Sequence, residues 1–158
     1  MDTQAELRFD RGDQTPERLK RQLSRLLGMT SAQASRVAAE ALAPFGAHKA
    51  HFVVLAALEE FGPASQASIS DRTRIYRSDL VAVLNELAEG GWIVRAPDPD
   101  DKRRNVITIT DAGRERLAQI EAVLDAVNDR IMAPLGADER EQLFSLLGRV
   151  NAHLASGG

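Results

Sequence analysis

The feature that most constrains the fold of this chain is a change in hydrophobic period about two-thirds of the way along it. Up to Glu89, apolar residues recur at spacings of three and four, which is typical of amphipathic helices. Over Trp92–Ala96, and again over Val106–Thr110, the period is two, which indicates β-strands. The loop between them, residues 97–104, is charged and holds two prolines, so it cannot lie inside a strand. The pattern predicts one β-hairpin in a chain that is otherwise mainly α.

Capping residues and helix breakers set the expected helix limits. Thr15-Pro16-Glu17 is a helix start, and the apolar spacing predicts one continuous helix from there to about Ala41. Gly62-Pro63 and Gly90-Gly91 end two later helices. The remaining helices are expected over residues 49–60, 66–73 with Ser65 as N-cap, 77–89, from the N-cap Thr110 up to Pro134-Leu135-Gly136, and through the apolar positions 143–154.

Length and composition exclude several classes of protein. The chain has 158 residues and a net charge of -3, which fits one domain or two small units sharing a core. It is too short for a dinucleotide-binding domain with a substrate domain, or for a (β/α)₈ barrel. The absence of cysteine excludes disulfides, thiolate zinc sites and iron–sulfur clusters. Without an apolar run of about 18 residues or a signal-peptide pattern, we expect a soluble, cytoplasmic protein without a membrane partner.

A helix, a tight turn, a second helix and then a charged hairpin is the order of elements in a winged helix-turn-helix. Residues 66–116 carry equal numbers of basic and acidic residues, but the basic ones concentrate at the turn and the loop tip. These are the two places where such a fold meets phosphates, so we expect double-stranded DNA as a partner. The candidate DNA-binding residues are Ser65, Gln66, Arg72, Arg74, Arg77, Ser78, Asp79, Val81, Ala82, Lys102, Arg103 and Arg104.

The residue types at these positions suit the reading of a duplex. Arg77 can pair bidentately with guanine, and Val81 or Ala82 can lie against a thymine methyl group. Asp79 compensates the helix dipole in the first turn, the interpretation we favour, or accepts from a cytosine amino group. An arginine at a stiff loop tip suits a narrow minor groove, and Asp101 can hold the guanidinium of Arg103.

The terminal helices indicate self-association. We expect four regions: a flexible arm over 1–14, a dimerisation helix over 15–45, the winged lobe over 46–113 and C-terminal dimerisation helices over 114–158. The short centre cannot cover the apolar faces of both flanking helices, which favours a homodimer over a monomeric bundle. The expected interface residues are Leu19, Leu23, Leu26, Leu143, Leu147, Val150 and Leu154.

The loop segment Asp98-Pro99-Asp100-Asp101-Lys102-Arg103-Arg104, followed by residues 106–113, resembles the wing of the MarR family of bacterial transcriptional regulators. The shared pattern is an acidic residue with proline, Asp-x-Arg and Thr-x-x-Gly, and the resemblance runs from about Thr15 to Leu154. It implies wing roles for Asp101 and Arg103, and a recognition helix that begins at Arg77, Ser78 and Asp79. It also implies a dimer built from the terminal helices.

The resemblance further implies a small aromatic acid or drug-like effector, bound between the dimer helices and the DNA-binding lobe near His51. The corresponding prediction is that His51→Ala alters the response to ligand but not the affinity of the ligand-free protein. The chain departs from the family where members often carry glycine at Arg74, a capping hydroxyl at Tyr76, arginine at Ala82 and a small residue at Arg104.

Other kinds of site have weaker support in the sequence. His48 and His51 have a spacing compatible with two metal ligands, but His153 is remote and no cysteine or tight carboxylate cluster joins them. We therefore expect solvated or dimer-contacting histidines, with no metal and no cofactor. No serine-hydrolase or phosphate-loop motif is present, so we expect no enzyme. The interpretation is a sequence-specific regulator, a ligand-released repressor that acts as a homodimer on a near-palindromic site. The alternative is a winged-helix module for protein interaction or dimerisation without DNA binding.

Overall fold

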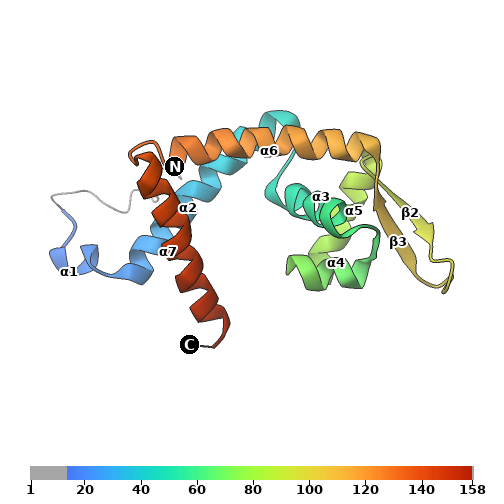
Figure 1. Cartoon of the computed structure of the whole chain (residues 1–158), viewed down its shortest axis with the longest axis horizontal. Coiled ribbons are helices and arrows are strands. Elements are labelled where there is room, and N and C mark those ends of the chain that lie inside the picture. Colours follow the sequence, from blue (N-terminus) through green and yellow to red (C-terminus); the bar gives the residue numbers. More distant parts are fainter. Residues whose placement is uncertain (1–13, 158) are drawn as a thin grey trace, which may run out of the picture. The chain divides into compact units, whose positions relative to one another are not determined.

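The computed structural model describes residues 14–157, so the expected arm lies outside the described residues except for Gln14. These residues form helices and one small sheet (Figure 1). The chain divides into two compact units, one ending at Leu124 and the other beginning at Asp125. In chain order the elements are α1 (Glu17–Lys20), α2 (Leu23–Leu42), the 3₁₀ turn η1 (Ala43–Phe45), α3 (Lys49–Phe61), β1 (Ala64–Ser65), α4 (Gln66–Thr73), α5 (Arg77–Glu89), β2 (Ile93–Pro97), β3 (Asn105–Ile109), α6 (Asp111–Ile131) and α7 (Ala137–Ala155).

The expected fold, mainly α with a small hairpin, is confirmed, but the first helix is not continuous. α1 ends at Lys20, and Gln22 adopts an extended conformation before α2 begins. The prediction of one helix from Thr15 to Ala41 is therefore wrong at Arg21 and Gln22. Because neither residue is proline or glycine, the sequence contains no local signal for this break.

The core of the first unit gathers the apolar faces of α3, α4, α5 and the sheet. On α5 the buried residues recur at the expected positions, which places one face of that helix inward and leaves the other exposed. This arrangement fixes the direction in which the outer face of α5 points. The core residues of the four elements are Val54, Leu55, Leu58, Ile69, Leu80, Val83, Leu84, Leu87, Ile93, Ile107 and Ile109.

The sheet has three antiparallel strands in the order β1-β3-β2. The predicted hairpin pairs Ile93 with Ile109 and Pro97 with Asn105. The additional strand, β1, pairs Ala64 with Ile107 on the other side of β3. The sequence analysis missed β1 because a strand of two residues shows no period. Its pairing ties the start of α4 to the hairpin.

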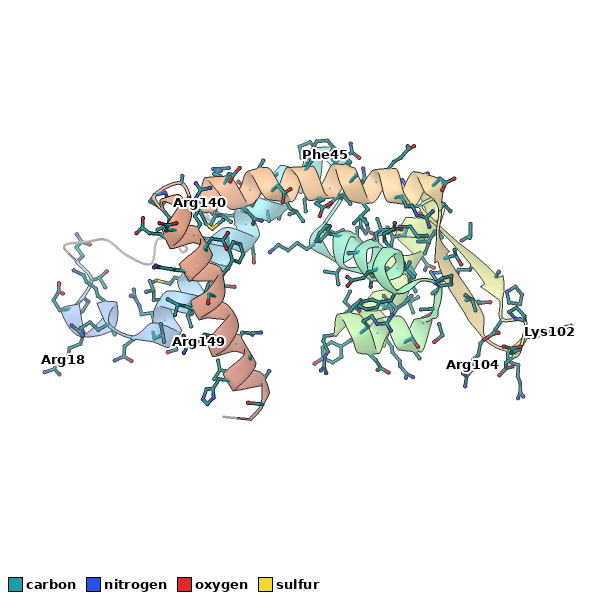
Figure 2. All side chains as sticks on the ribbon, viewed as in Figure 1. Arg18, Phe45, Lys102, Arg104, Arg140 and Arg149 are labelled. Atoms are coloured by element: carbon teal, nitrogen blue, oxygen red, sulfur yellow. The ribbon has the colours of Figure 1, made fainter. Side chains whose placement is uncertain are left out.

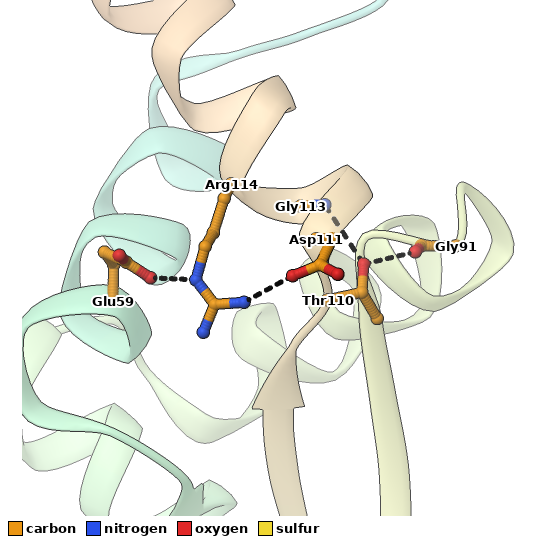
Figure 3. A network of polar contacts seen from close by, with 6 residues as sticks. All are labelled: Glu59, Gly91, Thr110, Asp111, Gly113 and Arg114. Carbon is orange, nitrogen blue, oxygen red and sulfur yellow. Dashed lines mark hydrogen bonds and ion pairs between the residues drawn. The ribbon is translucent and has the colours of Figure 1, made fainter.

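Thr110 forms the predicted N-cap of α6 and connects the first turn of that helix to the turn that follows α5 (Figure 3). Its hydroxyl accepts from the N–H of Gly113 at 3.0 Å and donates to the carbonyl oxygen of Gly91 at 2.7 Å. A Cβ on Gly113 would lie 2.1 Å from the carbonyl oxygen of Trp92, so this approach requires glycine. Beside it, Arg114 bridges Glu59 of α3 and Asp111 (Figure 3). The base of the hairpin is therefore fixed to α6 and α3.

The second unit is built around α7. The carboxylate of Glu139 accepts from the N–H of Gly136, and Arg140 donates to Asp129 at 2.9 Å. Val127 and Met132 are buried, whereas α7 exposes a series of large apolar side chains. These exposed residues are Phe144, Leu146, Leu147, Val150 and Leu154.

Within residues 14–157, no single helix has the length and hydropathy to cross a membrane. Only the bent pair of residues 23–45 and 49–61, which meet at 79°, meets both criteria when taken together.

Candidate nucleic-acid interface

Ser65 begins the helix-turn-helix and is the N-cap of α4, as predicted. Its Oγ accepts from the N–H of Ser68 at 3.2 Å and lies at the same distance from the hydroxyl of Ser68. Ser65 and Gln66 are both half-buried, at the point where β1 runs into α4. The hydroxyl of Ser65 is thus engaged in holding the helix start.

The turn between α4 and α5 is held by side-chain hydrogen bonds to backbone oxygens. The hydroxyl of Ser70 donates to the carbonyl of Ile75 at 2.7 Å, and the hydroxyl of Thr73 donates to that of Ile69 at 2.7 Å. Arg74 occupies the left-handed region with a φ of 62° and its N–H binds the carbonyl of Ser70. These contacts set the angle between the two helices.

α5 exposes a row of small and polar side chains opposite its buried face. Arg77, Ser78 and Asp79 form its exposed first turn, and Val81 and Ala82 are exposed in the next. Apart from Arg77, these five side chains are small, so they do not prevent the helix from entering the major groove of DNA. The candidates on α5 therefore share one accessible face.

The tip of the hairpin is a tight loop built by its own acidic residues. The N–H of Asp98 binds the carbonyl of Arg104 at 2.8 Å, and Oδ1 of Asp98 accepts from the N–H of Asp100. Oδ1 of Asp101 accepts from the N–H of Arg103 at 3.1 Å and lies 3.5 Å from its Nε. Asp101 thus holds both the backbone and the guanidinium of Arg103.

The basic side chains of this loop point into solvent. The side chain of Arg103 is 94% exposed and that of Arg104 is 71% exposed. Figure 2 shows Lys102 and Arg104 at the end of the hairpin farthest from α6. Three cations therefore extend from a loop whose backbone is internally bonded.

Two further contacts link the candidate elements, and the sequence analysis missed both. Nη2 of Arg95 on β2 donates to Oδ1 of Asn85 on α5 at 2.9 Å. The guanidinium carbon of Arg72 lies 4.1 Å from the ring centroid of Phe61, a cation–π contact between α4 and α3. The partners of each contact lie on different elements, so no spacing within one helix or strand predicts them. The first joins the hairpin to α5.

His48, His51 and Glu86 form a cluster between α3 and α5. Nε2 of His48 and Nε2 of His51 lie 2.8 Å and 2.7 Å from the same oxygen of Glu86. Burial lowers the pKa of His51, and the hydrogen bonds from His48 and His51 lower the pKa of Glu86. No sequence pattern pointed to Glu86 as a partner of the histidines, because it is 35 residues from His51 in sequence but adjacent in the fold.

Comparison with known proteins identifies the family. The MarR family's sequence profile matches residues 46–104. The uncharacterized HTH-type transcriptional regulator YkoM of Bacillus subtilis is 32% identical over 108 residues, which cover 68% of this chain and 70% of YkoM. The chain belongs to the MarR family. It is therefore related to transcriptional regulators with a winged helix-turn-helix.

Solved structures of MarR-family proteins share the fold. The transcriptional repressor CouR, bound to a 23-mer DNA duplex, is 29% identical with a TM-score of 0.77, and the match covers 85% of this chain and 96% of CouR. A mutant of Escherichia coli MarR complexed with operator DNA is 26% identical with a TM-score of 0.70, and the match covers 81% of this chain and 92% of that one.

The structure shows how this MarR-family chain accommodates its departures from the common pattern. Arg74 adopts the left-handed conformation that the frequent glycine takes at low energy. Tyr76 occupies the N-cap of α5 without a side-chain cap hydrogen bond and is 80% exposed. Arg74 and Tyr76 therefore add a cation and an exposed ring to the surface of the turn.

Proposed function

We propose that this chain is a sequence-specific, double-stranded DNA-binding regulator that acts as a homodimer. Each protomer places α5 in a major groove and the hairpin tip in the adjacent minor groove. The twofold symmetry implies a near-palindromic site with half-sites about 10 bp apart or a multiple of that spacing. The proposal assigns the protein no catalytic step and places its action on bacterial DNA, in the cytoplasm.

The observation that carries the proposal is the distribution of exposed cations around α5. Cationic side chains occupy the turn before the helix and the tip of a hairpin that is hydrogen-bonded to the helix through Arg95 and Asn85. Between them, α5 exposes only small or hydrogen-bonding side chains in its first two turns. A protein-interaction module has no need for cations at both places.

The residues take different roles in this proposal. Arg77 and Ser78 contact base edges, and Val81 and Ala82 lie against thymine methyl groups. Arg103 enters the minor groove, where a narrow groove attracts a guanidinium, and Asp101 positions it. The phosphate contacts come from Arg72, Arg74, Lys102 and Arg104, while Ser65, Gln66 and Asp79 support the start of each helix.

The exposed apolar residues of the terminal helices support the homodimer. Leu19 on α1 and Leu23 and Leu26 at the start of α2 are 44%, 61% and 48% exposed. On α7, Leu147, Val150 and Leu154 are between 40% and 63% exposed, and Leu143 is half-buried. Large apolar side chains that recur exposed along one helix, as they do on α7, mark an interaction site.

The role as a ligand-released repressor is a further part of the proposal. CouR, which is 29% identical to this chain, is named as a transcriptional repressor, and this supports a repressor role for the chain. Release by a small aromatic acid or drug-like molecule rests on the family resemblance. It requires that such a compound lower the affinity for the cognate duplex in a dose-dependent way.

The test is selection of binding sites from random duplexes by the purified full chain, followed by a salt titration of the selected duplex. We expect a two-part, near-palindromic motif and an affinity that falls steeply with salt, because each cation that meets a phosphate releases counterions. Selection of no motif, together with salt-independent binding, would refute the proposal and favour the protein-interaction module.

A further inference from the structure

The cluster of His48, His51 and Glu86 has no part in the proposed DNA contacts. His48 is the N-cap of α3 and His51 lies three residues later, so both imidazoles project from the first turn of that helix. Glu86 reaches them from α5. One ligand atom from each of the three residues lies within 4.8 Å of the others. Two helices thus bring three metal-ligating groups to one point.

We propose that His48, His51 and Glu86 bind a divalent transition-metal ion of the zinc type and that this ion connects α3 to α5. Two imidazoles and one carboxylate are a ligand set that binds Zn²⁺ with a fourth position left open. The side chains of His48 and Glu86 are about half exposed, so the fourth position faces solvent. A water molecule can complete the tetrahedron there.

The geometry requires a small expansion of the cluster. Zinc lies about 2.0–2.1 Å from an imidazole nitrogen and about 2.0–2.2 Å from a carboxylate oxygen, so tetrahedral ligands are about 3.3 Å apart. The nitrogen–oxygen distances are 2.8 Å and 2.7 Å. His51, with a side chain only 2% exposed, is fixed, whereas the more exposed His48 and Glu86 can move outward. The ion therefore enters from the solvent side.

The state of His51 favours ligation but limits its strength. The side chain of His51 is buried and its Nε2 is directed toward Glu86, so this ligand is already oriented for an ion. Its Nδ1 is buried and has no hydrogen-bond partner. When Nε2 binds a metal, the ring proton resides on Nδ1, where a metal-binding histidine normally donates to an acceptor. The site is consequently weaker than a structural zinc site, and its ion exchanges.

Metal binding has a consequence for the proposed DNA-binding face. Glu86 belongs to the same helix as Arg77 and Ser78, so an ion that holds Glu86 against α3 resists displacement of α5 from the lobe. An ion that binds only the folded protein also raises its resistance to unfolding. Both effects require the ion to reach Glu86 and at least one histidine together.

The experiment uses untagged, metal-free full-length protein without DNA. Zn²⁺ is titrated in competition with a chromophoric chelator, and Co²⁺ binding is followed by its visible absorption. We expect one ion per chain, tetrahedral Co²⁺ absorption, and an affinity about tenfold or more weaker in His48→Ala and in Glu86→Gln. Both substitutions alter partly exposed side chains, and circular dichroism verifies that the variants are folded.

Matched controls separate this site from general metal binding. His153→Ala removes an exposed histidine of α7, and Glu89→Gln removes an exposed carboxylate of α5. We expect both to keep the wild-type affinity. Equal affinity in wild type, His48→Ala and Glu86→Gln would overturn the proposal, as would a wild type that does not compete with the chelator. Because no DNA is present, either result leaves the proposed function intact.

Discussion

The guanidinium of Arg116 on α6 lies over the indole of Trp92, with its central carbon 4.3 Å from the ring centroid. Arg116 is only 9% exposed and donates to the carbonyl of Phe45 in η1 and to the side chain of Gln119. A single side chain thus connects α6, the residue preceding β2 and the segment between α2 and α3. The sequence gives no indication of this role, because the partner of Arg116 in η1 is 71 residues away.

We predict that Arg116→Ala lowers the free energy of unfolding by about 2–4 kcal/mol, from lost charged hydrogen bonds and the lost cation–π contact. Arg116→Lys keeps the charge but not the planar fork and is expected to fall between alanine and wild type. Urea unfolding followed by circular dichroism measures both. A fully stable Arg116→Ala would contradict the role of this contact.

Gly113→Ala tests the close approach of α6 to the base of the hairpin. The added methyl group would meet the backbone oxygen of Trp92, which cannot rotate away, so we expect a loss of about 1–3 kcal/mol of stability. Gly136→Ala is the control, since the nearest atom to its Cβ is the Glu139 carboxylate oxygen at 3.4 Å. It should cost less than about 1 kcal/mol. Equal effects in thermal unfolding would count against the steric explanation.

Arg74→Gly should change stability and DNA affinity in opposite directions. Relief of the left-handed strain of about 1–2 kcal/mol exceeds the entropic cost of glycine of about 0.5–1 kcal/mol, so we expect a net gain in stability. Loss of one phosphate contact from each protomer should reduce the salt slope of DNA binding by about one per protomer, or about two for the dimer. Calorimetry and a salt titration measure the two effects. Asparagine also tolerates the left-handed conformation, so Arg74→Asn should show the same reduction in the salt slope of DNA binding.

Arg103→Ala tests the wing assignment. We expect specific binding to weaken by about 1–3 kcal/mol per protomer, with relaxed preference at the minor-groove positions. Fluorescence anisotropy with the selected duplex measures this change. Arg36→Ala, which removes an equal charge from an ion pair with Glu40 on α2, should bind as wild type does. If both variants bind alike, the hairpin tip does not contact the duplex.

Leu147→Glu tests the homodimer. A carboxylate within the apolar face of α7 must lose its hydration when that face is covered, so we expect dissociation into monomers at micromolar concentration. Ser145→Glu adds the same charge on the opposite side of the helix and should leave the dimer intact. Sedimentation equilibrium separates the two masses. A dimer that tolerates Leu147→Glu would exclude this face as the interface.

The parts of the fold that the sequence predicted depend on neighbouring residues. The buried face of α5, the caps at Ser65 and Thr110, and the hairpin follow from short-range spacing and turn chemistry. The strand β1 was missed because it exists only through its pairing with β3, and the break at Gln22 was missed because no proline or glycine marks it.

The same distinction applies to the candidate sites. The cations of the turn and hairpin tip stand out in sequence because they are clustered. Glu86 does not stand out in the sequence, because its two histidine partners are 35 and 38 residues away. Only the packing of α5 on α3 brings the three residues together. Asn85, on the polar side of the same helix, is likewise explained only by its hydrogen bond to Arg95.

That hydrogen bond has a mechanical consequence. On the proposed function, the tether between the β-ribbon and α5 restrains the spacing of the two elements that contact the duplex in each subunit. Binding sites that differ in the local pitch or curvature of the double helix must then absorb the mismatch themselves. Discrimination among operators would therefore include how readily each one deforms, even at base pairs that no side chain reaches.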